Sequence, residues 1–289
     1  MTRRQADLTL LLATFLWGTT FVAVKSALAF ATPLAFLTVR FGIATLLLTP
    51  GTRFDPRPTG RELRGGLLLG ALVAIGFITV TAGLVITTPS RAAFIVAVSS
   101  VLAPVIALAL LGQRPGWLTA TALALATLGI YLLTAPDGGG LNRGDLLTLI
   151  CAACFGGQIV GVTELGRHYD ARRLVWFQVA GTAVVAGLAT LLLEQPHIRW
   201  TGEFVGALAY TVAFASSLCF IMQMRAQRHM SSARAALIFC CEPLFAALTS
   251  WLVLGERLAA TQWLGGACIV LGMIGSDLPA SRVVPTRTG

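Results

Sequence analysis

The chain repeats one stretch of its own sequence at a distance close to half its length. Residues 91–114 and 234–257 lie 143 positions apart and are identical at eight of twenty-four aligned positions. Both copies begin with Arg-Ala-Ala and end with Leu-Gly, a variable residue and Arg. A duplicated unit predicts two domains with the same fold, and we place them at 1–138 and 139–289.

The composition indicates whether this unit folds in water or in a membrane. Apolar residues make up 56% of the 289 positions and charged residues 11%, whereas about 25% of a soluble domain is charged. Such a chain has too few polar groups to cover a soluble surface. Its apolar runs are about 17–24 residues long, which is the length of helix that crosses a bilayer. We therefore expect an all-α integral membrane protein.

Short segments with turn residues separate the apolar runs. The longest of these segments, 50–65, is polar and too short to form a soluble domain. The runs predict ten transmembrane helices, five in each repeat, at 8–28, 33–49, 66–86, 91–111, 117–134, 145–165, 173–193, 201–224, 233–254 and 261–277.

The basic residues predict the orientation. If the chain starts in the cytoplasm and alternates, fifteen of the 21 basic residues fall in cytoplasmic segments, five fall in external ones, and Arg40 lies within a span. This bias follows the positive-inside rule and predicts a multi-pass protein of the inner (cytoplasmic) membrane with both termini cytoplasmic. The net charge of +9 is then a topology signal. We expect no nucleic-acid partner, because no basic groove is interleaved with aromatic residues.

The N-terminus has a second interpretation. Arg3 and Arg4, an apolar run and Ala27-Leu28-Ala29 together also resemble a cleaved signal peptide. The apolar run is long for a signal peptide, and the duplication requires this helix, so we interpret it as the first span.

An odd number of helices per repeat turns the second copy upside down in the membrane. Two inverted five-helix repeats are the architecture of many secondary transporters, whose substrate site lies near the bilayer midplane between the copies. Two other classes stay open: an integral-membrane enzyme acting on lipid, and a channel for small neutral solutes. An enzyme needs a nucleophile or an acid/base pair with partners, and all three histidines lie in predicted loops. A channel needs a ring of like charges or a filter motif, and the sequence has neither.

Two motifs resemble a known family. Glu242-Pro243-Leu244-Phe245, followed by Leu254-Gly255-Glu256, resembles the closing motif of the EamA-type proteins of the drug/metabolite transporter superfamily. Phe15-Leu16-Trp17-Gly18 resembles their opening motif, and the chain is most like the YddG-type amino-acid exporters. The resemblance implies ten helices, two EamA units and secondary export of small metabolites by alternating access. The first repeat departs from the motif, because Ser99-Ser100 stands where Glu242-Pro243 would fall.

Polar side chains within a span are costly and mark transport pathways more often than chance. Glu242 lies near the middle of the ninth predicted span, directly before Pro243, which removes a backbone donor. Its carboxylate is a candidate to bind an ammonium group or a proton, or to fix the packing of neighbouring helices. Phe239 shares its helical face. Ser99 is its counterpart in the first repeat and either faces it or bonds its own helix.

Three arginines are candidates for gating or structural roles. Arg40 is the only base in the interior of a predicted span, because the other bases inside the ranges lie within four residues of a span end. It meets a substrate carboxylate, pairs with a carbonyl or an acid, or snorkels toward the cytoplasmic end of the second helix. Arg91 and Arg234 open the fourth and ninth helices at opposite faces of the membrane, where they hold a gate or serve the same structural purpose twice.

The other candidates for the pathway are amide and aromatic side chains. Gln158 lies between two glycines and either binds a zwitterion or bridges close-packed helices. The indole donor of Trp17 lies mid-span, and it either faces a cavity or packs. Three phenylalanines either form apolar lining or simply pack against neighbouring helices: Phe77, Phe94 and Phe214. We expect helices one, three, four, six, eight and nine to line the pathway, with five and ten at the periphery.

The expected substrate is a neutral, partly apolar small molecule, most specifically a zwitterionic amino acid or a similar metabolite. A phosphorylated substrate would need several bases at the midplane to offset desolvation. Membrane lipid is the other expected partner, and no oligomer is required. We expect no cofactor, no metal and no catalytic residue: Cys151 and Cys154 have metal-ligand spacing, but no second pair or nearby histidine completes a site.

Overall fold

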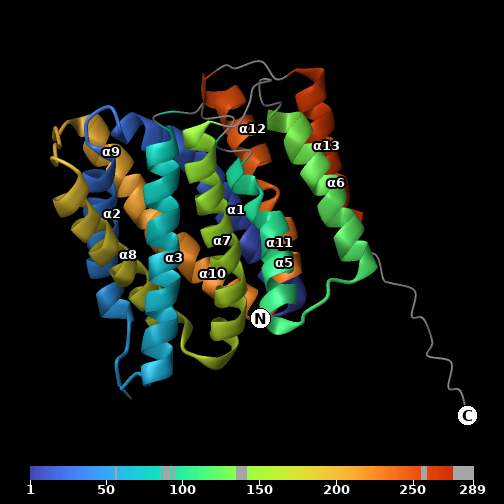
Figure 1. The fold of residues 1–289 in the computed structure, drawn as a ribbon, viewed down its shortest axis with the longest axis horizontal. Coiled ribbons are helices and arrows are strands. Elements are labelled where there is room, and N and C mark those ends of the chain that lie inside the picture. The colour runs from blue at the N-terminus through green and yellow to red at the C-terminus, as the bar shows by residue number, and fades with distance from the viewer. Residues whose placement is uncertain are drawn as a thin grey trace, which may run out of the picture.

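The structure is a computed structural model, and it describes residues 1–55, 57–84, 86, 92, 95–134, 142–254 and 259–275. Its helices run side by side in a single bundle (Figure 1). The described residues contain no β-strand, and their only bridge of that kind is an isolated pair between Ala31 and Ile198. The class predicted from the sequence, an all-helical protein, is therefore confirmed for this part of the chain.

The first half of the chain forms five labelled α-helices and one short 3-10 turn. Their bounds are α1 Arg3–Ala27, α2 Pro33–Leu48, η1 Thr49–Gly51, α3 Gly60–Leu84, α5 Ser99–Leu111 and α6 Trp117–Thr134. The ends follow ordinary capping chemistry. Thr2 and Gln5 form a capping box at the start of α1. Gly112 ends α5 with a φ of 66°, a conformation that favours the glycine found in the repeated Leu-Gly motif.

The second half is more interrupted. Its helices are α7 Arg143–His168, α8 Ala171–Leu193, α9 Gly202–Tyr210, the π-helix η2 Thr211–Leu218, α10 Cys219–Gln227, α11 Ser232–Phe239, α12 Glu242–Leu254 and α13 Ala260–Gly275. The predicted helix 201–224 is thus a continuous rod whose middle is a π-helix. The predicted helix 233–254 is two helices that meet at Cys240-Cys241.

The lengths and composition of the helices suit a bilayer. Six helical stretches in the described chain are long and apolar enough to cross a membrane, and three shorter apolar helices accompany them. The number of ten spans stays a prediction. Two helices begin well before their predicted starts, α1 at Arg3 rather than near 8 and α3 at Gly60 rather than near 66. The early start of α3 has a clear cause. Its first turn is held by buried Glu62, which accepts a hydrogen bond from Arg173 of α8 at 2.8 Å.

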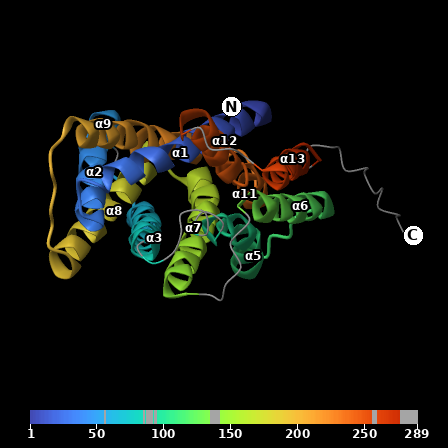
Figure 2. The same cartoon turned by 90° about the horizontal axis from the view of Figure 1, so that it is seen from above.

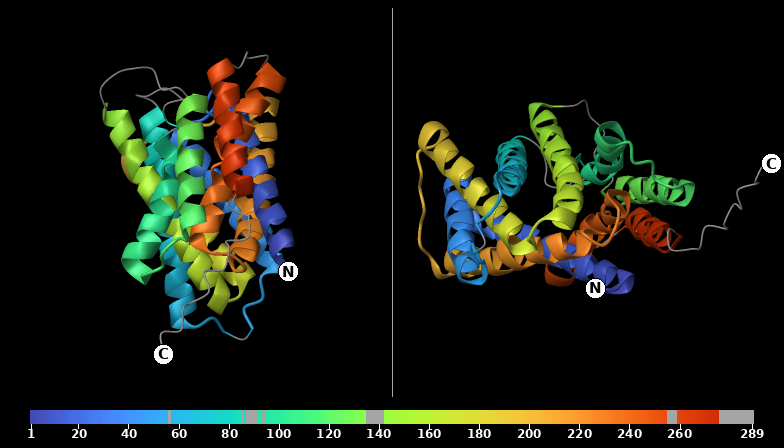
Figure 3. Two further views of the ribbon diagram at one scale, coloured as in Figure 1. Left: turned by 90° about the vertical axis from the view of Figure 1, so that its right-hand side faces the viewer. Right: turned by 90° about the horizontal axis from the view of Figure 1, so that it is seen from below.

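Seen along the helices, the bundle is elongated (Figure 2). One long side is formed by α1, α9, α10 and α12, and the opposite long side by α8, α3, α7 and α5. The α2 helix lies at one end, and α6 and α13 lie together at the other end (Figure 3). The α6–α13 contact is very close: a Cβ on Gly129 would lie 2.6 Å from the carbonyl oxygen of Gly265. These two helices match the pair that the sequence analysis expected at the periphery.

The membrane orientation can be tested with single cysteines in a cysteine-free background. Arg57→Cys lies in the loop before α3, and Gln195→Cys lies between α8 and α9, at the other end of the bundle. Because the arginine-rich helix ends lie at the N-terminal end of the bundle, we expect the Arg57→Cys thiol to react only with reagent on the cytoplasmic side. The Gln195→Cys thiol should react only with external reagent. Labelling of both variants from the same side would contradict the topology.

Candidate functional site

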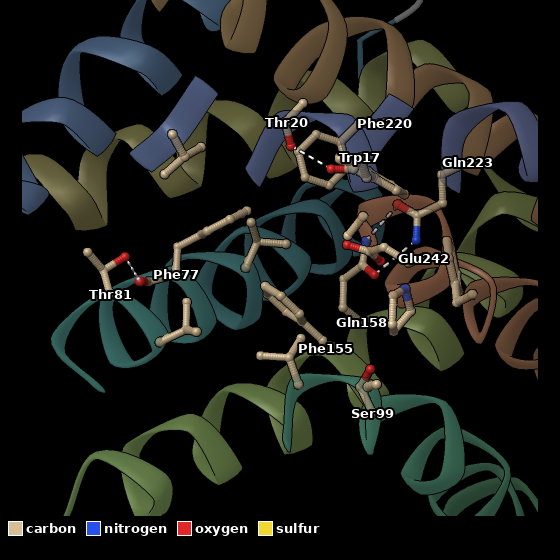
Figure 4. Close-up of a pocket in the computed structure, with 18 of the residues that line it drawn as sticks. Trp17, Thr20, Phe77, Thr81, Ser99, Phe155, Gln158, Phe220, Gln223 and Glu242 are labelled. Carbon is tan, nitrogen blue, oxygen red and sulfur yellow. Dashed lines mark hydrogen bonds between the residues drawn. The ribbon is translucent and has the colours of Figure 1, made fainter. Parts of the chain in front are cut away.

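A cavity of about 210 Å³ lies inside the bundle (Figure 4). Side chains from α1, α2, α3, α5, α7, α10, α11 and α12 line it, together with Leu28, Val96 and Ala97. Its wall is mostly apolar and contains six aromatic rings, which belong to Trp17, Phe36, Phe77, Phe155, Phe220 and Phe239. A concave, mainly apolar cavity with a few polar groups is the usual form of a small-molecule site.

The cavity extends toward the end of the bundle that is farther from the N-terminus. On α1 its lining runs from Trp17 to Leu28, and on α3 it runs from Val73 to Thr81, so it follows the second half of each helix. The opposite end is closed by polar contacts. Arg234 of α11 binds Asp7 of α1 through two hydrogen bonds of 2.8 and 2.7 Å.

Most of the residues predicted for the pathway meet in this cavity. Trp17, Phe77, Ser99, Gln158, Phe239 and Glu242 line it, together with Arg40 and Pro243. Arg234 does not, because it lies in the closed end. Phe94 and Arg91 lie outside the described residues.

Phe214 is not among the residues of the cavity wall. It is 38% exposed and its ring packs on Tyr210, with the centroids 5.0 Å apart, which agrees with the second of its two interpretations, simple packing. Residues 211–218 form a π-helix, whose turn is longer than that of an α-helix. The π-helix changes which residues of this rod face the interior, and Ala215 and Ser216 are turned inward and buried instead.

The π-helix holds two cavity residues of the first half. The indole Nε1 of Trp17 donates to the carbonyl oxygen of Ala215 at 3.0 Å, and Nε of Arg40 donates to Oγ of Ser216 at 2.7 Å. Single π-helical turns expose carbonyls in this way and often lie at functional sites. The indole donor of Trp17 is therefore used within the protein, and its ring, packed against Phe220 and Phe239, forms part of the wall.

Arg40 places α2 in the cavity wall, which the sequence analysis did not expect of the second helix. Its side chain is 2% exposed, so it does not snorkel to the end of the span. The guanidinium carbon lies 5.3 Å from the ring centroids of both Phe41 and Phe77 and 6.0 Å from that of Phe36. In the described chain no carboxylate forms a salt bridge with it.

Gln158 belongs to a buried cluster of glutamines. It exchanges two hydrogen bonds with Gln223 of α10, at 3.1 and 3.0 Å, and its amide nitrogen lies 3.4 Å from Oε1 of Gln178 on α8. The cluster joins α7, α8 and α10, and Figure 4 shows Gln158 and Gln223 of this cluster side by side at the cavity. Gln158 therefore bridges helices, as one of its two interpretations predicted. The sequence analysis missed Gln178 and Gln223, although each is a polar residue in a predicted apolar span.

Glu242 starts α12 at the break in the ninth predicted span, and Pro243 occupies the next position, where its missing N–H costs nothing. The carboxylate lines the cavity near Gln158 and Gln223 (Figure 4), and no described group donates a hydrogen bond to it. Its counterpart Ser99 likewise starts α5 and lines the cavity. The two repeats thus begin a helix at equivalent positions on the cavity wall.

The opening motif packs directly on the closing motif. A Cβ on Gly18 would lie 2.9 Å from Cβ of Phe245 and 3.0 Å from the carbonyl oxygen of Glu242. The ring of Phe15 meets the ring of Phe245 edge to face, with centroids 5.3 Å apart. The two stretches that carry the family resemblance therefore lie side by side at the edge of the cavity.

Comparison with protein families identifies the chain. The model of the EamA-like transporter family matches residues 4–135 and again residues 142–276. The chain belongs to this family. An uncharacterized transporter of Archaeoglobus fulgidus is 33% identical, over 94% of this chain and 85% of the relative. The inner membrane transporter YicL of Salmonella typhimurium, also uncharacterized, is 25% identical, over 96% of this chain and 97% of the relative.

Two further similar proteins are a relative whose name states its substrates and a protein of known structure. The S-adenosylmethionine/S-adenosylhomocysteine transporter of Chlamydia trachomatis is 27% identical, over 89% of this chain and 84% of the relative. A crystal structure of another protein has a TM-score of 0.81 at 18% identity and covers 96% of this chain and 100% of that one. At this identity the second likeness shows the fold alone. The family and its members indicate a multi-pass membrane transporter of a small molecule rather than an enzyme.

The contact between the motifs predicts the effect of adding volume at Gly18. We expect Gly18→Val to reduce stability by about 1–3 kcal/mol, because the new methyl groups must displace the backbone of α12. Gly42→Val is the matched control, since a Cβ at Gly42 has no atom within 4 Å. Thermal unfolding in detergent measures both variants. Equal midpoints for Gly18→Val and wild type would show that α1 does not pack on α12 in this way.

The Asp7–Arg234 pair predicts a charge-swap result. Asp7→Arg puts two cations together at the closed end, and we expect it to lower the unfolding free energy by about 1 kcal/mol. Adding Arg234→Asp re-forms the pair in reverse and should recover most of the loss. If the double variant is no more stable than Asp7→Arg alone, the pair does not hold the closed end.

Proposed function

We propose that this protein exports small neutral zwitterionic metabolites, most specifically amino acids of the kind carried by YddG-type exporters, across the cytoplasmic membrane. The observation that carries the proposal is the carboxylate of Glu242, which lines an aromatic-walled cavity and accepts no hydrogen bond from any residue that the structure describes. At about 210 Å³ the cavity is smaller than the pockets of roughly 300–1,000 Å³ that hold drug-sized ligands. It therefore suits a small metabolite.

Glu242 is the group that we assign to the substrate ammonium. A carboxylate away from water strongly favours a cation that arrives with its own hydrogen-bond donors. The rings of Trp17 and Phe239 lie 5.9 Å apart, centroid to centroid, and line the same cavity. Their faces add a cation–π attraction for an ammonium and an apolar contact for a side chain. The indole N–H of Trp17 has no part in binding, because Ala215 accepts it.

The inverted arrangement of the two repeats, 1–138 and 139–289, is also part of the proposal. It is supported by matching contacts: a Cβ on Gly18 would meet Phe245, the Glu242 carbonyl and Ala246, whereas a Cβ on Gly156 would meet Leu102, the Ser99 carbonyl and Ala103. Each residue of the second trio lies 143 positions before its counterpart in the first trio. The same helix contact is thus made twice. In each case the first helix of one repeat packs on the fourth helix of the other repeat, as expected for two inverted copies of one unit.

Alternating access follows from this symmetry. With both termini in the cytoplasm, the cavity reaches toward the external side while the Asp7–Arg234 end is closed. Exchanging the conformations of the two repeats would close the external side and open the cytoplasmic side around the same substrate. Export down a concentration gradient needs no coupling ion, so we assign no proton-carrying role to Glu242.

The name of the Chlamydia relative is compatible with this substrate class. S-adenosylmethionine and S-adenosylhomocysteine both carry the ammonium and carboxylate of an α-amino acid. The nucleoside part of those molecules makes them much larger than a free amino acid, and the cavity volume favours the smaller substrate for this protein.

Counterflow in liposomes tests the proposal. Wild-type protein should exchange labelled neutral amino acids saturably. Glu242→Gln should reduce this exchange at least tenfold, which corresponds to about 1.4 kcal/mol of lost binding. Glu203→Gln changes an exposed acid at the start of α9 and should have no effect. Conductance instead of saturable exchange, or exchange of phosphorylated substrates alone, would contradict the proposal.

A further inference from the structure

The cavity contains a cation as well as the Glu242 carboxylate. Arg40 is 2% exposed and lines the cavity. A guanidinium has five N–H donors, and within the described chain its hydrogen bond is the single one from Nε to Ser216. The two terminal nitrogens are therefore left for a group in the cavity.

A buried guanidinium without a counter-ion is costly, because burial removes its water and returns no opposite charge. Other acids near spans are already bonded elsewhere: Asp7 to Arg234, Glu62 to Arg173, and Glu194 to the backbone nitrogens of Leu34 and Ala35. The three phenylalanine rings around Arg40 offset part of the cost. They supply no acceptor in the plane of the N–H groups.

The side chain is also held in one orientation. Ser216 belongs to the π-helix, whose Ala215 carbonyl fixes Trp17 on the same wall. A π-helical stretch interrupts the regular helix, and such stretches are frequent at functional sites. Here it fixes the Nε edge of the guanidinium, and the paired terminal N–H groups remain available for a planar, bidentate acceptor.

We infer that Arg40, oriented by Ser216, is the subsite that binds the carboxylate of the substrate. The inference rests on the proposed function and extends it. Glu242 on α12 and Arg40 on α2 then recognise the two charges of one zwitterion, and the bound complex leaves neither protein charge unpaired. A simple amine would pair with Glu242 and leave the charge of Arg40 unpaired, and a simple acid would do the reverse. The site therefore discriminates against both classes of molecule.

Competition in counterflow separates this role from a structural one. The probes share one ring: phenylalanine has both charges, phenylalaninamide replaces the carboxylate by an amide, and 2-phenylethylamine has neither carboxylate nor amide. Wild-type protein should bind phenylalanine at least tenfold better than the two amines. Arg40→Gln should lose that preference by weakening phenylalanine alone, and Arg40→Lys should keep part of it.

Two control variants complete the design. Arg225→Gln removes an exposed arginine at the end of α10 and should leave the preference unchanged. Ser216→Ala removes the bond that orients Arg40 and should reduce the preference several-fold. Ser217→Ala changes the neighbouring serine, whose buried hydroxyl has no hydrogen-bond partner in the described part of the chain, and should not reduce the preference. The serine pair also tests the inference if Arg40→Gln does not fold.

The outcomes are distinct. If wild-type protein carries no amino acid, the proposed function fails. If it carries amino acids and Arg40→Gln keeps the full preference for phenylalanine over the amines, Arg40 is structural and the inference is overturned. If Arg40→Gln does not fold, equal preferences in Ser216→Ala and Ser217→Ala overturn it. Stronger competition by O-phosphoserine than by serine in wild-type protein would overturn it as well, because the Arg40 guanidinium would then bind a phosphate group in preference to a carboxylate.

Discussion

The close approach of α1 to α12 at Gly18 is the contact on which the cavity depends. A side chain larger than hydrogen fits at this position only if α12 shifts, because a Cβ would lie 2.9–3.1 Å from three atoms of α12. The contact holds the break before Glu242 beside the ring of Trp17, and Trp17 in turn bonds the π-helix. One side of the cavity is therefore assembled from the opening motif of the first half and the closing motif of the second. The matching contact at Gly156 assembles the opposite side around Ser99.

The apolar setting then decides which polar groups have structural roles and which are available to a ligand. Inside a membrane a polar group must be satisfied by the protein, by water or by a ligand. Gln158 and Gln223 satisfy each other, and Arg234 and Asp7 satisfy each other at the closed end. Glu242 and the terminal nitrogens of Arg40 have no such partner among the described residues. This difference carries the proposal of a zwitterionic substrate.

The sequence was enough to predict the helical class, most helix bounds and the motifs that meet at the cavity, because apolar run length and turn residues report local structure. It could not predict the contribution of α2, since which face Arg40 turns inward depends on tertiary packing. It could not decide between lining and packing for Phe214 either, because the π-helix that sets the direction of this side chain has no clear sequence signal. Trp17 was correctly placed in the cavity, but its use of the Ala215 carbonyl depends on a residue 198 positions away.

The central claim is that one cavity is opened alternately to the two sides of the membrane, and paired distance measurements test it most directly. Spin labels at Ser26 and Ile86 lie at or just beyond the ends of α1 and α3 that we predict to be external, on opposite sides of the bundle, and labels at Arg4 and Arg64 lie at the ends that we predict to be cytoplasmic. In lipid nanodiscs, adding a transported amino acid should populate a state in which the first distance shortens and the second lengthens. If both distances stay fixed under conditions of transport, or lengthen together, alternating access is contradicted.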